Sequence, residues 1–298
     1  MPWLQVKIDI KPALADLFED LLLNAGALSV TYQDSLDQPI YEPELGTTPL
    51  WSNTTISALF DAQNDMQTMK DTLHSSFAQS ATQASFPDLS IEILEDKDWE
   101  REWMNSYKPM KFGKRLWVCP SWCETPEPNA INLMLDPGLA FGTGTHPTTE
   151  LCLRWLDSID TLNKTVTDYG CGSGILGVAA LLLGAKSVLA VDIDKQALQA
   201  TNTNLERNHI APDRLLAYLP EDAPQLTTDI LVANILSGPL VELAPVLAQR
   251  INSSGLLALS GLLADQEQDI IQAYSPWFDL EPATELDGWI RVTGTRKQ

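Results

Sequence analysis

Cysteine is scarce in this chain, and a long hydrophobic run is missing. The four cysteines are Cys119, Cys123, Cys152 and Cys171. They do not have the spacing of a zinc site, because Cys119 and Cys123 have no second pair to match. We therefore expect free thiols, no metal and a reducing compartment. The longest apolar run, residues 175–185, is too short to span a bilayer, and residues 1–11 contain charges where a signal peptide would have an apolar core. These absences favour a cytoplasmic protein without membrane contact.

Positive charge is also scarce. The chain carries 40 acidic and 19 basic residues, for a formal net charge of -21 at pH 7. Such a surface repels phosphate backbones, which argues against direct, non-specific binding of nucleic acid. It attracts basic proteins, although an acidic surface also serves solubility. The length of 298 residues predicts about two domains, with enough chain to bury a core without disulfides.

The first 94 residues show a repeating order of strand and helix patterns. Residues 3–10, 27–32, 54–60 and 89–94 are predicted strands, and the predicted helices follow Pro12 and cover residues 64–77. The resulting β-α-β-β-α-β order is that of a small ferredoxin-like α+β domain. Because this fold binds many kinds of partner, the pattern predicts architecture and not function.

The chain changes character after residue 94. Residues 95–107, EDKDWEREWMNSY, are dense in charge and predict a helical linker, in which Trp99 and Trp103 dock the helix on a neighbour. From 108 to 298, strand and helix patterns alternate and end in a hairpin at Asp287-Gly288. This alternation predicts an α/β domain with a Rossmann-like, mostly parallel sheet and one antiparallel strand. The predicted domains are therefore 1–94 and 108–298, joined by the linker.

Three glycines at alternate positions stand between a predicted strand and a predicted helix. Gly170, Gly172 and Gly174 let the backbone approach a ligand, and the free N–H groups of the helix point into the same space. A dinucleotide fingerprint, G-x-G-x-x-G, would need glycine at position 175, where the chain has Ile175, and a P-loop lysine is missing. The turn therefore predicts a nucleotide-like cofactor, and Ile175 at the third glycine position counts against an NAD-dependent oxidoreductase.

Two further polar residues follow predicted parallel strands. Asp192 lies 22 residues beyond Gly170 and can accept both hydrogen bonds of a ribose diol. Asn234 ends the apolar run 229–234, where an unpaired amide would be costly. Ligands in such sheets bind beyond the carboxyl ends of the strands, so we expect Gly170, Asp192 and Asn234 to share one site.

Residues 135–149, LDPGLAFGTGTHPTT, form a glycine- and threonine-rich loop. A ligand-binding or lid role is predicted, because such a sequence has little to pack by itself. His146 is more typical of a turn residue than of a general base. Thr148 or Thr149 is predicted to cap a helix that begins near Glu150.

Several stretches together resemble one protein family. They are LEDKDWEREW, LDPGLAFGTGTHPTT, DYGCGSGILGVAAL, VDIDKQAL and VANIL. The acid and three glycines of residues 168–174 resemble motif I of the class I S-adenosylmethionine-dependent methyltransferases. The full set is similar to the PrmA family, which methylates ribosomal protein L11, over the whole chain. The resemblance implies methyl transfer from S-adenosylmethionine to lysine ε-amines and the N-terminal α-amine of that protein, with the N-terminal domain recognising the substrate.

The resemblance also implies roles for individual residues. Those expected to bind the cofactor are Thr149, Gly170, Asp192 and Asn234, with Phe141, Gly142 and Gly172 lining its pocket. Asn234 is also the expected catalytic residue, because its amide can orient the amine. Asn234-Ile235-Leu236 stands where many amine and amide methylases have Asn-Pro-Pro-Tyr, which argues against a release-factor glutamine methylase.

Two alternatives remain from the sequence. One is a methyltransferase of another basic protein, and the other is a non-catalytic factor that binds a ribosomal protein. The motifs around Gly170, Asp192 and Asn234 weigh against the second. We expect a monomer, and the sequence leaves open which amines are modified, in what order and how many times.

Overall fold

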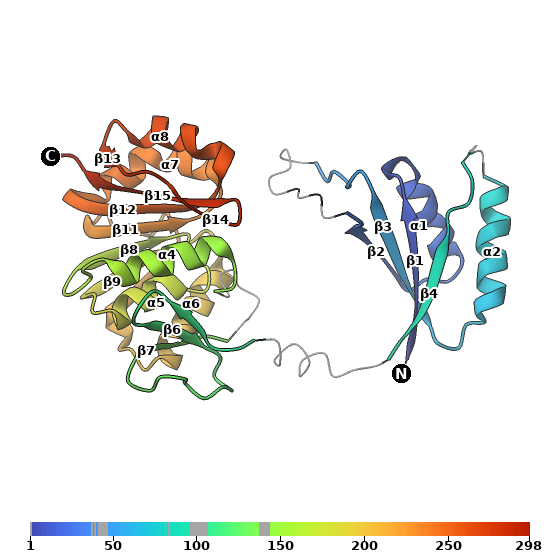
Figure 1. The fold of residues 1–298 in the computed structure, drawn as a ribbon, viewed down its shortest axis with the longest axis horizontal. Coiled ribbons are helices and arrows are strands. Elements are labelled where there is room, and N and C mark those ends of the chain that lie inside the picture. Colours follow the sequence, from blue (N-terminus) through green and yellow to red (C-terminus); the bar gives the residue numbers. More distant parts are fainter. Residues whose placement is uncertain are drawn as a thin grey trace. The chain divides into compact units, whose positions relative to one another are not determined.

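The protein consists of two compact units, residues 1–104 and 105–298 (Figure 1). The computed structural model describes residues 2–36, 38, 40, 47–80, 82, 84–95, 107–136 and 144–298. The boundary between the units falls within the segment expected to be a linker. Residues 96–106 of that segment, including Trp99 and Trp103, lie outside the described residues, so the expected linker helix stays a prediction.

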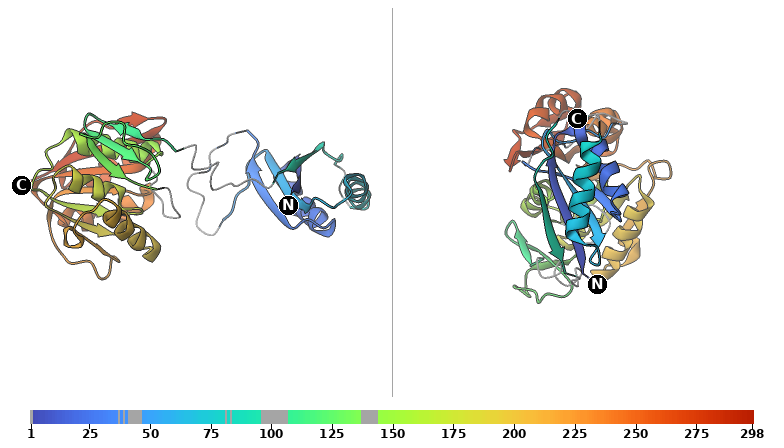
Figure 2. Two further views of the ribbon diagram at one scale, coloured as in Figure 1. Left: turned by 90° about the horizontal axis from the view of Figure 1, so that it is seen from below. Right: turned by 90° about the vertical axis from the view of Figure 1, so that its right-hand side faces the viewer.

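The N-terminal unit is a four-stranded antiparallel sheet with two helices. Its elements are β1 (Trp3–Ile10), α1 (Ala15–Asn24), β2 (Ser29–Asp34), β3 (Thr54–Asp61), α2 (Met66–Ala78) and β4 (Leu89–Leu94), with a short 3-10 turn (Pro12–Leu14) before α1. The strand order is β2-β3-β1-β4. Alternate residues of β1, such as Val6 and Ile8, are buried together with Phe18 of α1 and Phe77 of α2, and Figure 2 shows α2 lying along the sheet. The predicted ferredoxin-like arrangement is confirmed.

The C-terminal unit contains a small sheet and a large one. The small sheet has β5 (Met110–Phe112), β6 (Leu116–Cys119) and β7 (Ile131–Met134). The large sheet contains β8 (Thr165–Tyr169), β9 (Ser187–Val191), β10 (Leu215–Tyr218), β11 (Thr228–Asn234), β12 (Ile251–Leu263), β13 (Phe278–Leu280), β14 (Thr284–Leu286) and β15 (Trp289–Arg296). Its order is β10-β9-β8-β11-β12-β15-β13, with β14 paired to β15.

The five strands from β10 to β12 are parallel, and β15 runs antiparallel to its neighbours. The predicted Rossmann-like, mostly parallel sheet is therefore confirmed. The hairpin at Asp287-Gly288 is also confirmed, since both residues have the positive φ of a tight hairpin turn, 51° and 79°.

Helices cover both faces of the large sheet. They are α4 (Pro147–Ser158), α5 (Ile175–Leu182), α6 (Lys195–Arg207), α7 (Ser237–Gln249) and α8 (Glu267–Tyr274). Along β11, Ile230 and Val232 pack with α4 and α5, whereas Leu231 and Ala233 pack with α7 and α8. Because the strands are buried on both sides, their sequences are continuous apolar runs rather than alternating ones.

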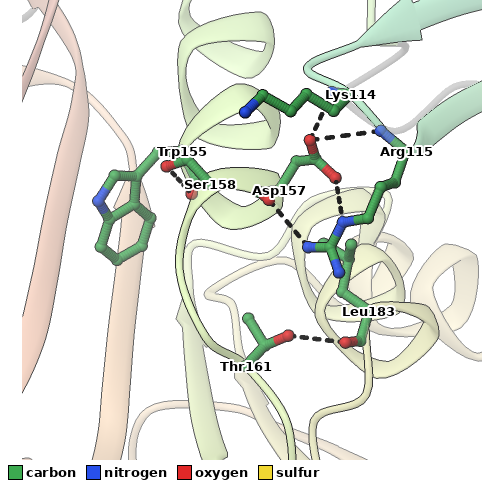
Figure 3. Close-up of polar contacts among 7 residues, drawn as sticks. All are labelled: Lys114, Arg115, Trp155, Asp157, Ser158, Thr161 and Leu183. Atoms are coloured by element: carbon green, nitrogen blue, oxygen red, sulfur yellow. Dashed lines mark hydrogen bonds and ion pairs between the residues drawn. The ribbon is translucent and has the colours of Figure 1, made fainter.

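A buried carboxylate joins the small sheet to α4 (Figure 3). Asp157 accepts hydrogen bonds from the backbone N–H of Lys114 at 2.5 Å and from Nε of Arg115 at 3.0 Å. Arg115 Nη2 also donates to the carbonyl oxygen of Asp157 at 2.8 Å. The preceding turn needs Gly113, because its φ is +69° and a Cβ there would run into the Asp157 side chain.

Two structural absences hold for the described part of the chain. No helix in it is long and apolar enough to cross a bilayer. No cluster of histidine, cysteine and acidic side chains there has the arrangement of a metal site. All four cysteines are free thiols, and three of them are buried.

Candidate functional site

The site is built on the register of three adjacent parallel strands. Tyr169, the last residue of β8, pairs with Val191 of β9 on one side and with Ala233 of β11 on the other. The next residues along the three strands are Gly170, Asp192 and Asn234. The strand order reverses direction at β8, which is where open α/β sheets bind ligands. The three residues expected to share a site therefore lie side by side at the carboxyl ends of the parallel strands.

The turn after β8 requires its first glycine for two reasons. Gly170 has a φ of +76°, in the left-handed region, and a Cβ at this position would run into the side chain of Ile235. Its N–H donates to the carbonyl of Val191 at 2.7 Å. The chain that follows Asn234 thus packs directly on the glycine turn, which brings the ends of β8, β9 and β11 into contact.

Asp192 is tied to the same turn. Its Oδ2 accepts a hydrogen bond from the N–H of Gly172 at 2.8 Å, and its Oδ1 accepts from the N–H of Asp194 at 3.0 Å. These two bonds hold the carboxylate in one orientation. The side chain is partly exposed, and each carboxylate oxygen can accept a further hydrogen bond from a ligand.

Helix α6 supports the glycine turn from behind, a role that the sequence did not reveal. Thr201 donates from Oγ1 to the carbonyl of Gly172 at 3.1 Å, and Asn204 donates from Nδ2 to the carbonyl of Ser173 at 2.8 Å. Both side chains are buried. The sequence feature that could have indicated this role is the presence of polar residues on the buried face of an amphipathic helix.

Asn234 and Thr149 meet at the second part of the site. Asn234 donates from Nδ2 to Oγ1 of Thr149 at 3.4 Å, and Thr149 is fully buried. Thr149 lies in the first turn of α4, so this contact joins the start of that helix to the end of β11. The two residues are 85 positions apart in the sequence and come together only through the fold.

The start of α4 corrects one expectation. The helix begins at Pro147, earlier than predicted, and its N-cap is His146 and not Thr148 or Thr149. Proline is favoured in the first helical turn, which explains the earlier start. Nδ1 of His146 lies 2.8 Å from Oγ1 of Thr148 and accepts from the backbone N–H of the same residue at 3.4 Å.

His146 also packs against the C-terminal hairpin. Its ring meets that of Trp289 edge to face, with 4.7 Å between centroids. Burial lowers the pKa of His146, because it disfavours the charged imidazolium. These contacts agree with the prediction that His146 is a turn residue and not a general base.

Asp168 is the most unusual ionisable group near the turn. Its side chain is fully buried, and Oδ2 accepts a hydrogen bond from the N–H of Gly177 at 2.8 Å. Within the described residues, Oδ1 has no hydrogen-bond partner. Burial, helped by the nearby negative charge of Asp192, raises the pKa of Asp168 to about 7, although the hydrogen bond from Gly177 acts in the opposite direction. A buried oxygen of this kind suits a ligand that brings a cation or a hydrogen-bond donor.

Two large apolar side chains at this edge are exposed. Ile193, directly after Asp192, is 85% exposed, and Leu236, two residues after Asn234, is 49% exposed. Sequence reasoning missed both, because exposure at the end of a strand is not visible in a hydrophobic pattern. An apolar surface beside polar anchors is typical of a ligand site.

Phe141 and Gly142 lie in residues 137–143, outside the described residues, and their assignment to the cofactor pocket stays a prediction. The described part of the site therefore consists of Gly170, Gly172 and Asp192 on one side and Asn234 and Thr149 on the other.

Comparison with known proteins gives consistent matches along the chain. The sequence model of the family described as "Ribosomal protein L11 methyltransferase (PrmA)" matches residues 2–297. A ribosomal protein L11 methyltransferase from Marinomonas sp. is 55% identical over 296 residues, which is 99% of each chain. A protein of the same name from Pseudomonas syringae pv. tomato is 54% identical over 297 residues, covering 100% of both chains. The crystal structure of a ribosomal protein L11 methylase from Lactobacillus delbrueckii subsp. bulgaricus matches with 34% identity and a TM-score of 0.59, over 64% of this chain and 100% of that one.

The buried carboxylate generates a prediction about pH. Since the pKa of Asp168 is raised from 3.8 to about 7 in the folded state, the folded protein holds a proton that the unfolded chain has lost, and its stability falls as the pH rises between these two values. Asp168→Asn keeps an acceptor for the Gly177 N–H and removes the charge. Without ligand, the variant should be more stable than the wild type at pH 8, by up to roughly 4 kcal/mol, and should lose this advantage as the pH falls towards 4.

Urea unfolding at pH 5 and pH 8 measures this difference, with Asp213→Asn at an exposed aspartate as the control for the substitution itself. A constant difference between Asp168→Asn and the wild type across this range would contradict the prediction.

Proposed function

The chain belongs to the PrmA family of ribosomal protein L11 methyltransferases, and we propose that it transfers methyl groups from S-adenosylmethionine to amines of ribosomal protein L11. The acceptors are lysine ε-amines and the N-terminal α-amine. One observation carries the proposal. The glycine turn, Asp192 and Asn234 lie at the ends of three adjacent strands that are paired in register.

The described residues fit the parts of this cofactor. The buried Oδ1 of Asp168, which lacks a partner within the described residues, suits the ammonium group of a methionine moiety or a water bound to it. Because glycine has no side chain, the backbone of the turn can come close to the cofactor. Asp192 can accept hydrogen bonds from the two ribose hydroxyls. Ile193 offers an exposed apolar surface to a flat base. When bound, S-adenosylmethionine supplies a methyl group that is attached to a positively charged sulfur, which is a good leaving group because it becomes a neutral thioether.

Asn234 is the proposed catalytic residue. Thr149 holds its Nδ2, which leaves Oδ1 to accept a hydrogen bond from the acceptor amine. Such a bond orients the nitrogen lone pair, and positioning is the main requirement when the leaving group is good. We also propose that Thr149, Phe141 and Gly142 complete the cofactor pocket.

The amine must lose its proton before it attacks. A free lysine has a pKa of about 10.4, and burial in the site lowers the pKa because it disfavours the ammonium form. His146 uses Nδ1 as the cap of α4, so we assign it no role as a base. Solvent is the proposed proton acceptor.

The N-terminal unit is the proposed substrate reader. Residues 1–104 contain 18 acidic and 5 basic residues, whereas the proposed cofactor residues all lie in the other unit. A strongly acidic unit attracts a basic protein and speeds its association. We propose that the enzyme acts as a cytoplasmic monomer on this protein substrate, without direct contacts to nucleic acid or membrane.

The decisive experiment compares the full chain with residues 105–298 alone. The full chain should add methyl groups to unmethylated ribosomal protein L11, detected by intact-mass spectrometry, and its association with L11 should slow as salt rises. Residues 105–298 should bind S-adenosylmethionine with unchanged affinity and should lose methylation of L11. Cofactor binding by the full chain without methyl transfer would identify a non-catalytic factor. Full methylation by residues 105–298 would remove the substrate role of the N-terminal unit.

Replacing Asp192 tests the cofactor site. Asp192→Ala removes charge-assisted hydrogen bonds worth about 1.5–3 kcal/mol. The affinity for S-adenosylmethionine should therefore fall by roughly ten- to a hundredfold in titration calorimetry. Asp213→Ala, at an exposed aspartate, is the matched control. Unchanged affinity in a folded Asp192→Ala protein would show that this carboxylate does not hold the ribose.

Replacing Asn234 tests the chemical step. Asn234→Ala should lower kcat more than it weakens cofactor binding, because the amide acts on the amine in the transition state. Single-turnover kinetics and calorimetry measure the two effects separately. Equal losses in both would make Asn234 a cofactor ligand only.

A further inference from the structure

Leu236 occupies a position where leucine is unusual. It is the N-cap of α7, with an extended backbone (φ -61°, ψ 154°), and it has no side-chain hydrogen bond to the helix. Polar residues are strongly preferred at this position, since their oxygen accepts from a free N–H of the first turn. Asp194 caps α6 in this way with a carboxylate oxygen, and His146 caps α4 with its ring nitrogen Nδ1. The sequence thus places an apolar side chain where a polar one would stabilise the helix.

The residue before it fixes the direction of Leu236. Ile235 contacts Gly170 on one side, where a Cβ would collide with the Ile235 side chain. It contacts Gly261 on the other side, where a Cβ would collide with the Ile235 backbone carbonyl. Gly261 has a φ of +88°, which favours glycine. With Ile235 held between two glycines, the next side chain faces outward, and 49% of Leu236 is exposed.

Leu236 is also close in the chain to the proposed amine-binding group. Asn234 Nδ2 donates to Thr149 Oγ1, and Ile235 and Leu236 follow directly in the chain. An acceptor lysine must bring its amine to Asn234 while its four methylene groups cross the rim of the site. Lysine stems pack along apolar surface while the nitrogen reaches a polar group. An α-amine has no such stem.

We propose that Leu236 is a specificity-determining residue that packs against the aliphatic stem of the acceptor lysine. This inference rests on the proposed function. It assigns Leu236 to lysine acceptors and not to the N-terminal α-amine or the cofactor. Leucine is therefore present at this helix terminus for the substrate, although serine or aspartate would serve the helix better.

The test uses the full-length enzyme with ribosomal protein L11 as substrate. Leu236→Ser removes the apolar surface and adds a capping oxygen, so the variant should fold with an unchanged or higher Tm. Its kcat/KM for lysine methylation should fall about five- to tenfold, mainly through KM, because a buried apolar contact is lost. The Kd for S-adenosylmethionine and the rate at the α-amine should stay within about twofold of the wild type.

Two further variants serve as controls. Val246→Ser changes a residue of similar exposure, 41%, on the same helix but more than two turns away, and should leave both reactions unchanged. Leu236→Met keeps an apolar side chain of similar volume and should restore lysine methylation. If the wild type methylates lysine alone, the test compares two constants of Leu236→Ser. The inference requires that the KM for L11 rises while the Kd for S-adenosylmethionine stays unchanged.

The outcomes separate the inference from the function. Wild-type lysine kinetics in Leu236→Ser, or equal losses at lysine, α-amine and cofactor, would overturn the role of Leu236 and leave the proposed function standing. A wild-type enzyme that methylates no amine of L11 would overturn both.

Discussion

The in-register pairing of β8 with both β9 and β11 is the constraint on which the site depends. It puts Gly170, Asp192 and Asn234 one residue beyond the same row of the sheet. A slip of one residue in either pairing would move a strand by about 3.3 Å and turn its side chains to the other face. The contact between Ile235 and Gly170 and the hydrogen bond from Gly172 to Asp192 both require the observed register.

Several residues at the carboxyl ends of these strands are in environments that are unfavourable for the stability of the fold. Asp168 is a fully buried carboxylate whose second oxygen lacks a partner within the described residues. Leu236 stands at a helix terminus without a capping side chain, and Ile193 exposes an apolar surface. Local rules are broken in this way where a protein must bind something. By contrast, Asp157 is also buried, but hydrogen bonds from Lys114 and Arg115 satisfy its carboxylate.

Much of this arrangement could be predicted from the sequence, because strand, turn and helix signals are local. The glycine turn, the acid after the second strand and the Asp287-Gly288 hairpin follow from short patterns with a physical cause. The braces from Thr201 and Asn204 could not be found, since they depend on how α6 packs against the turn. The prediction that Thr148 or Thr149 caps α4 was wrong. Threonine is a common N-cap residue, but here His146 is the cap and Pro147 is the first residue of the helix.

The distribution of charge within the site follows from the acceptor chemistry. An amine attacks only when it is neutral, and a nearby carboxylate would raise its pKa and hold the proton. Asp168 lies in β8 just before the glycine turn, and Asp192 directly follows β9, where the proposed cofactor binds. The proposed acceptor side instead has neutral groups, the amide of Asn234 and the side chain of Leu236. Asparagine at position 234 can therefore accept a hydrogen bond from the amine without stabilising the ammonium, whereas aspartate there would orient the amine and also keep it protonated.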